Sequence, residues 1–141
     1  MGRGVSAVLM AFVLAVVFAV SAVAAAPGVA RAATVGGDCS LGTRYPVSSV
    51  EPYQTDQVAG VSNVGRVLRG ADIYVVAQPG VTREWLQRQL ESEVVTGACD
   101  FGVDRPTVDV ISAGGGFTVR VSGPSEAAAH EILRRAEPLA E

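Results

Sequence analysis

The chain has 141 residues, a formal net charge of -3 and no lysine. An acidic chain repels phosphate backbones and anionic headgroups, so nucleic acid is a poor partner for it. With only two cysteines and one histidine, the sequence also has few residues for a metal centre or a catalytic triad.

The first 32 residues resemble a secretory signal peptide. An early arginine, Arg3, precedes an apolar run over residues 5–26, and Pro27 ends that run. Residues 30–32 read Ala-Arg-Ala, which fits the A-x-A pattern of signal peptidase sites. We expect cleavage before Ala33 and an exported protein, periplasmic or extracellular. The alternative is an uncleaved helix that anchors the chain in the membrane, and only then would it contact a bilayer.

The exported part would have one domain. Residues 33–65 are rich in glycine, proline and serine and have no sustained period, so we expect an irregular N-terminal arm there. Residues 66–141 carry the periodic segments and are expected to form a small α+β domain. Cys39 lies in the arm and Cys99 in the domain, and export favours a disulfide between them.

A strand and a helix open the expected domain. Ile73, Val75 and Ala77 alternate with polar residues, which predicts a strand with one apolar face. Residues 82–96 follow as a helix, with Thr82 as its N-cap and Gly97 as its C-terminal stop. Its apolar stripe consists of Leu86, Leu90 and Val94, spaced four residues apart.

The segment "ISAGGGFTVRV", residues 111–121, predicts a hairpin rather than a phosphate-binding loop. A Walker loop needs a lysine and a following helix, and this chain has no lysine. With Gly114 and Gly115 at the centre of a primed turn, Val110 faces Val119 and Asp109 faces Arg120. This register places the apolar partners on one face of the sheet and the two charges on the other.

A second helix ends the domain. Pro124 is expected at its first position, Ala129, Ile132 and Ala136 on its buried face, and Pro138 at its end. The fold class is therefore an α+β two-layer sandwich of order β-α-β-β-α, a ferredoxin-like pattern without its last strand, with both helices on one face.

Such a sheet leaves one edge of the strand at residues 73–77 unpaired. We expect the chain's own arm to cover it, through the part near residues 64–69 that leads into the strand. The alternatives are self-association through the same edge in a second copy, or a strand donated by another envelope protein.

Few residues are candidates for a functional site. His130 is the only histidine, and with Glu126 or Glu137 it would make at most a weak metal site. We expect no metal, no cofactor and no catalytic residue. Trp85, Tyr74 and His130 are the candidates for a partner or ligand surface.

The segment "PTVDVISAGGGFTVRVSGPSEAAAHEILRRA", within residues 82–136, resembles the BON domain of bacterial envelope proteins. That resemblance implies an envelope-binding role, including binding to phospholipid surfaces. The segments "AQPGVTREWLQRQLE", "GFTVRV" and "AHEILRRA" also resemble a group of small exported bacterial proteins of unknown function, which implies no activity.

The resulting hypothesis is an exported, non-enzymatic binding or protein-interaction module of the bacterial cell envelope. The alternative is a small exported enzyme or metal-dependent factor that uses His130. Substitution of His130 by alanine separates the two, because it abolishes the activity of the second and leaves the first intact.

Overall fold

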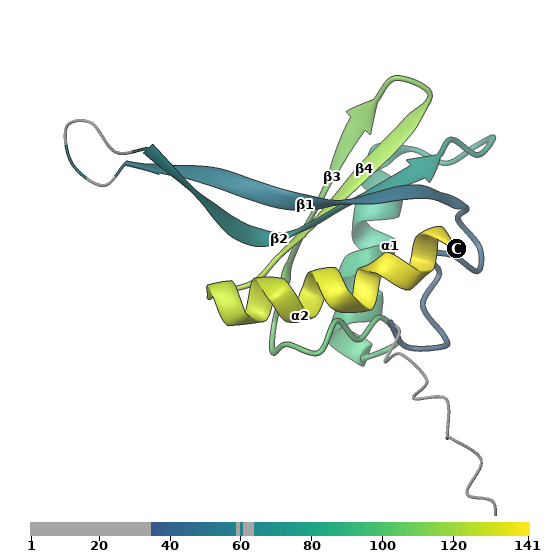
Figure 1. Ribbon diagram of the computed structural model, residues 1–141. Coiled ribbons are helices and arrows are strands. Elements are labelled where there is room, and N and C mark those ends of the chain that lie inside the picture. Colours follow the sequence, from purple (N-terminus) through teal and green to yellow (C-terminus); the bar gives the residue numbers. More distant parts are fainter. Residues whose placement is uncertain (1–34, 59, 61–63) are drawn as a thin grey trace, which may run out of the picture.

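The computed structural model describes residues 35–58, 60 and 64–141. The expected signal peptide at residues 1–32 lies outside the described residues. The described elements are β1 (Val47–Val58), β2 (Val64–Val76), α1 (Arg83–Thr96), β3 (Thr107–Ala113), β4 (Gly116–Ser122), α2 (Glu126–Ala136) and the 3-10 turn η1 (Glu137–Ala140) (Figure 1). Within this part of the chain, no helix is both long and apolar enough to cross a membrane.

The four strands form one antiparallel sheet in the order β1-β2-β4-β3. The α+β class is thus confirmed, but the predicted order β-α-β-β-α lacks a strand, because β1 precedes β2. The prediction of an irregular arm over residues 33–65 is wrong for β1. Its sequence, "VSSVEPYQTDQV", has few apolar residues, and Pro52 argued against a strand. Proline is tolerated here because β1 is an edge strand, where a missing backbone donor can face solvent.

The edge of β2 is covered by the chain itself, as expected, although by another segment. Val50 pairs with Ile73, and Val47 pairs with Val75. Residues 64–69, the expected cover, instead form the first part of β2. Pairing with β1 holds these residues in the strand.

The β3–β4 hairpin has the predicted register. Val110 pairs with Val119, and Asp109 pairs with Arg120. The predicted turn type is wrong, however: Gly115 has a φ of 84° but Gly114 has no positive φ, whereas primed turns need one at their first central residue. A three-glycine segment accommodates several turns, so the strands set the register without fixing the turn type.

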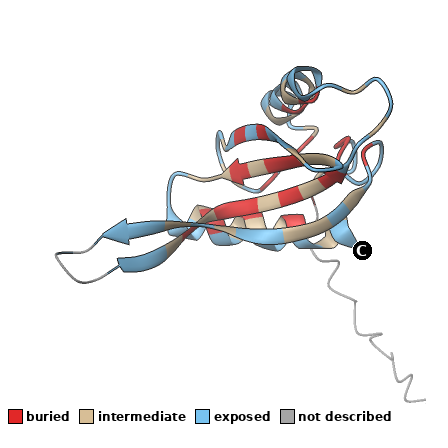
Figure 2. Cartoon of the chain, turned by 90° about the horizontal axis from the view of Figure 1, so that it is seen from above, coloured by how far each residue is buried: buried red, intermediate tan, exposed pale blue. Residues whose placement is uncertain are grey.

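Both helices contribute to one core. Alternate strand residues, including Ile73 and Val119 at 0% exposure, pack with Leu86 of α1 and Ile132 of α2 (Figure 2). The Thr82 side chain caps α1 and Gly97 ends it in a left-handed conformation, as predicted. In α2 the cap is Ser125, which accepts from the Ala128 amide, so this helix begins two residues later than predicted.

The β1–β2 hairpin extends beyond this core. In Figure 1 it projects past the end of α2, and in Figure 2 its distal part is exposed on both strands. Val58 and Val64, which pair with each other near its tip, are 72% and 66% exposed. α2 therefore covers only the proximal part of the hairpin.

Candidate functional site

A cavity lies between α1, the loop of residues 97–106 and the first half of β3. We call it the α1–β3 cavity; its volume is about 810 Å³, within the size range of small-molecule sites. Three elements of different kinds meet there because the loop leaves α1 at Gly97, turns back and enters β3 at Thr107.

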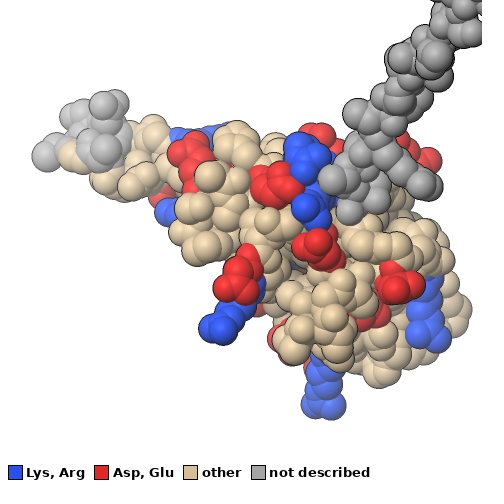
Figure 3. Space-filling view, turned by 90° about the horizontal axis from the view of Figure 1, so that it is seen from below, with Lys and Arg blue, Asp and Glu red and all other residues tan. Residues whose placement is uncertain are grey.

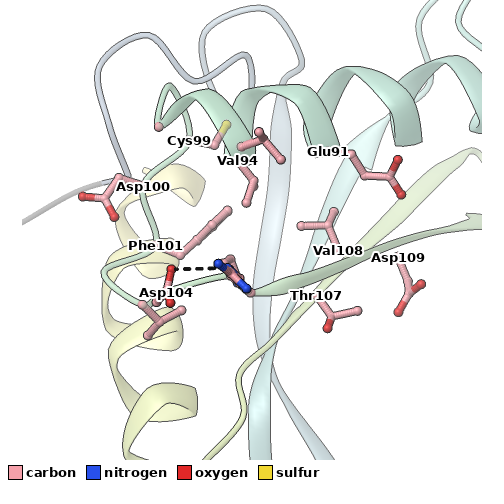
Figure 4. Close-up of a pocket in the computed structure, with 14 residues that line it drawn as sticks. Glu91, Val94, Cys99, Asp100, Phe101, Asp104, Thr107, Val108 and Asp109 are labelled. Atoms are coloured by element: carbon pink, nitrogen blue, oxygen red, sulfur yellow. Dashed lines mark ion pairs between the residues drawn. The ribbon is translucent and has the colours of Figure 1, made fainter.

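Apolar side chains form the inner wall of the α1–β3 cavity. Val94 of α1, Phe101 of the loop and Val108 of β3 point toward one another (Figure 4). Phe101 and Val108 are buried, and both Val94 and Val103 pack against the core. A ligand in the cavity would thus contact the edge of the hydrophobic core directly.

Charged side chains surround this apolar wall, and most are acidic. The lining includes four carboxylates and one guanidinium: Glu91, Asp100, Asp104, Asp109 and Arg105. Asp109 lies on β3 next to Val108 but points the other way in Figure 4. The face of the molecule seen from below in Figure 3 shows acidic and basic side chains interspersed.

An ionic network attaches the loop of the cavity to α2. Arg135 donates to Asp100 at 2.9 Å and to Glu131 at 2.7 Å. Hydrogen bonds from Arg134 and then Arg135 lower the pKa of Glu131 to about 2. The hydrogen bond from Arg135 to Glu131 also raises the pKa of Arg135. α2 therefore helps to hold the loop that forms one wall of the cavity.

Arg105 has an unusual backbone conformation at the rim of the cavity. Its φ is 50°, and no other non-glycine residue of the described chain has a positive φ. This region costs a non-glycine residue about 1 kcal/mol or more. Asp104, 4.0 Å away, is an exposed and therefore weak partner of Arg105.

The outer edge of β3 beside the cavity is occupied by a side chain of α1. The Gln87 amide donates to the Val108 carbonyl and accepts from the Val110 amide, both at 2.6 Å. It satisfies two backbone groups as a neighbouring strand would, which protects this edge from further pairing. Gln87 also donates to Glu91 at 2.6 Å and so links the edge to the rim of the cavity.

The predicted disulfide between Cys39 and Cys99 is confirmed. It is buried, and Cys99 lines the α1–β3 cavity. Glu93 lies beside it: its carboxylate accepts from the amide and hydroxyl of Ser40 at 2.9 and 2.8 Å. The segment before β1 is thus attached to α1 by two hydrogen bonds and to the loop after α1 by the disulfide.

The candidate surface residues lie on three separate elements, and none of them lines the α1–β3 cavity. Trp85 is 43% exposed on α1 and makes an edge contact with the Tyr45 ring at 6.0 Å. Tyr74 lies on the sheet face opposite the core, because its neighbours Ile73 and Val75 point into the core. His130 is exposed on α2.

His130 belongs to no group of three clustered metal-ligating side chains. Among the described residues, the one such group is Cys39, Glu93 and Cys99, whose ligand atoms lie within 4.8 Å of one another. Its sulfur atoms are joined to each other, so this group is a disulfide with a neighbouring carboxylate.

A smaller hollow of about 390 Å³ lies on the open face of the sheet. There Arg120 donates to Asp72 at 2.8 and 2.9 Å and lies 3.9 Å from the centre of the Tyr53 ring. The bonds to Asp72 raise the pKa of Arg120. Sequence reasoning placed Asp109 opposite Arg120 but missed Asp72, which comes from the other neighbouring strand. Because the principal charges of this hollow pair with each other, it offers a ligand less than the α1–β3 cavity does.

No protein-family model, curated protein sequence or solved structure matches this chain.

Sequence reasoning missed most of the cavity. Val94 was recognised only as part of an apolar stripe, and Phe101 and Val108 were not considered as site residues. One signal was available: residues 100–106, "DFGVDRP", place an aromatic residue among charges and turn residues between a helix and a strand. That composition is typical of a loop with a structural anchor and a charged rim.

Proposed function

We propose that the protein is an exported, non-enzymatic binding module of the bacterial cell envelope, and that the α1–β3 cavity is its binding site. The observation that carries the proposal is an apolar wall formed by Val94 of α1, Phe101 of the loop and Val108 of β3. Charged side chains lie at the rim of this wall. Binding sites for small ligands combine such apolar walls with a few polar groups that fix orientation.

Two further features support export and an envelope role. The first 32 residues have the composition of a signal peptide, and the buried disulfide suits an oxidising compartment. The resemblance of residues 82–136 to BON domains also favours an envelope role. Binding within the cavity, rather than along a strand edge, is favoured by the cover that Gln87 gives to β3.

The test is native mass spectrometry of the protein expressed from its full sequence and recovered from the cell envelope without denaturation. We expect a retained non-covalent ligand mass that Val95→Trp abolishes. Val95 lines the cavity and is 86% exposed, so the bulky replacement obstructs the site without altering the core. Ile111→Trp is the control, because Ile111 is an exposed residue outside the cavity lining.

Two results would contradict the proposal. One is a ligand that survives Val95→Trp but is lost with Ile111→Trp, which would place binding on the open face of the sheet. The other is turnover of a substrate that His130→Ala abolishes, which would favour an enzyme.

A further inference from the structure

The α1–β3 cavity has a carboxylate whose charge no other described residue pairs with. Asp100 pairs with Arg135, and Asp104 pairs weakly with Arg105. Glu91 forms no ion pair with any residue in the described part of the chain, and its one side-chain hydrogen bond comes from the neutral amide of Gln87. A second carboxylate oxygen is therefore available on the α1 wall.

Helix geometry places this carboxylate beside the apolar part of the cavity. Val94 and Val95 follow Glu91 by three and four residues, so the three side chains share one face of α1 with about 5–6 Å between neighbours. Val94 points toward Phe101 (Figure 4), and Val95 is an exposed residue of the cavity lining. One end of the cavity thus offers a negative charge, and the adjoining wall offers apolar contact.

These features discriminate between classes of ligand. An organic anion would meet the unpaired carboxylate of Glu91 on the α1 wall, which is unfavourable. A neutral apolar molecule would contact the apolar wall but leave the charge of Glu91 without an ionic partner. A cation with an apolar body would satisfy both, because its charge pairs with Glu91 while its body lies along Val94 and Phe101.

We infer that the α1–β3 cavity binds a small organic cation with an apolar body, and that Glu91 pairs with the cationic group. This inference rests on the proposed function, because it assigns a ligand class to the same site. An aryl-alkyl amine combines such a cationic group with an apolar body.

The test compares three probes that share a phenylbutyl skeleton and carry head groups of different charge: 4-phenylbutylamine, 4-phenylbutan-1-ol and 4-phenylbutanoate. Each is titrated into ¹⁵N-labelled protein expressed from the full sequence, and the amide signals of Val94, Phe101 and Val108 are followed by NMR. We expect the amine to bind about fivefold more tightly than the alcohol, as a partly exposed ion pair allows, and the carboxylate to bind most weakly. Raising the salt concentration to about 0.5 M should remove most of the advantage of the amine.

Two variants separate the ion pair from general packing. Glu91→Gln should reduce the affinity of the amine to that of the alcohol and leave the alcohol unchanged. Glu84→Gln on the same helix should change neither affinity, because Glu84 lies outside the cavity and pairs with Arg83. A Glu91→Gln variant that loses both ligands equally would contradict a role in charge recognition.

The possible failures are distinguishable. If the alcohol or the carboxylate binds as tightly as the amine at these residues, the cavity remains a binding site but the inferred class is wrong. If no probe shifts the cavity signals, the class inference fails, while a native ligand lost with Val95→Trp would still support the proposed function. If the peptide acetyl-Arg-Arg-Arg-amide shifts the signals and the amine does not, the occupant is a peptide and the inference is overturned.

Discussion

The two hairpins of the sheet differ in how their sequences specify them. In β3–β4, seven residues pair with seven without a bulge, and apolar residues alternate regularly toward the core. In β1–β2, the strands have 12 and 13 residues, and the pairing shifts register at Val47/Ser49 and at Tyr53/Gln54. The β1–β2 hairpin is the one that extends past the end of α2 (Figure 1).

This difference shows that strand pairing and strand patterning are separable. The alternation in β3–β4 reflects contact with the helix layer on one face, and such contact makes a strand visible in the sequence. The distal part of β1–β2 has no helix beneath it, so its side chains carry no such constraint. We therefore expect the proximal part of β1–β2 to depend on the disulfide that holds the segment before it, and β3–β4 to depend on packing against the helices.

The largest expected effect is loss of the disulfide. Cys39→Ser combined with Cys99→Ser removes a bridge across 60 residues, for which the chain-entropy model gives about 4 kcal/mol of stability. Urea denaturation would measure the loss. Hydrogen exchange should accelerate in β1 more than in β3, because the bridge holds the segment that leads into β1. Equal acceleration in both strands would contradict an anchoring role specific to β1.

Substitutions at the two ends of β2 should differ sharply. Ile73→Ala empties a site that is 0% exposed in the core and should cost about 3 kcal/mol. Val64→Ala, at a residue 66% exposed near the hairpin tip, should change the free energy of unfolding by less than about 0.5 kcal/mol. Comparable losses in urea denaturation would mean that the projecting part is buried in solution by another molecule.

Gln87→Ala should cost about 1 kcal/mol, because it removes the two hydrogen bonds to the β3 edge and leaves their backbone partners to water. Hydrogen exchange at Val110 should accelerate, while β1 should not change. Arg88→Ala, an exposed neighbour on the same helix, is the matched control. Unchanged protection at Val110 would show that the amide bridge does not persist in solution.

The smallest expected effect is on stability at acidic pH, and it should not be specific to either hairpin. The pKa of Glu131 is lowered from 4.5 to about 2 by Arg134 and Arg135, so the folded state favours its charged form. This contribution is complete above pH 4.5 and is lost as the pH falls toward 2. Glu131→Gln should therefore make urea midpoints less pH-dependent between pH 5 and 2.5 than they are in the parent protein. Glu137→Gln, an exposed carboxylate at the end of α2, is the comparison, and an equal flattening in it would refute the assignment to Glu131.

Much of the fold was predictable where one element packs on another. The stripe of Leu86 and Leu90 predicted α1, the pairing of Val110 with Val119 predicted the β3–β4 register, and the presence of two cysteines predicted the disulfide. β1 was not predictable, because Pro52 and scattered polar residues remove the signals of a strand. The partner of Arg120 was not predictable either, since Asp72 approaches from a strand distant in sequence.

The sequence alone determined the local elements in which each residue's environment repeats with a regular period: α1, α2, the β3–β4 hairpin and the end of β2. A regular pattern of buried and exposed positions requires a matching pattern of apolar and polar residues. These elements can therefore be recognised from residues that are neighbours in the sequence. Only the tertiary structure decided which strand covers β2, which carboxylate pairs with Arg120, and that Glu91, Val94, Phe101 and Val108 surround one cavity. Those outcomes depend on contacts between residues far apart in the chain, and no local sequence pattern predicts such contacts. The free energy that favours them arises only when the elements pack together.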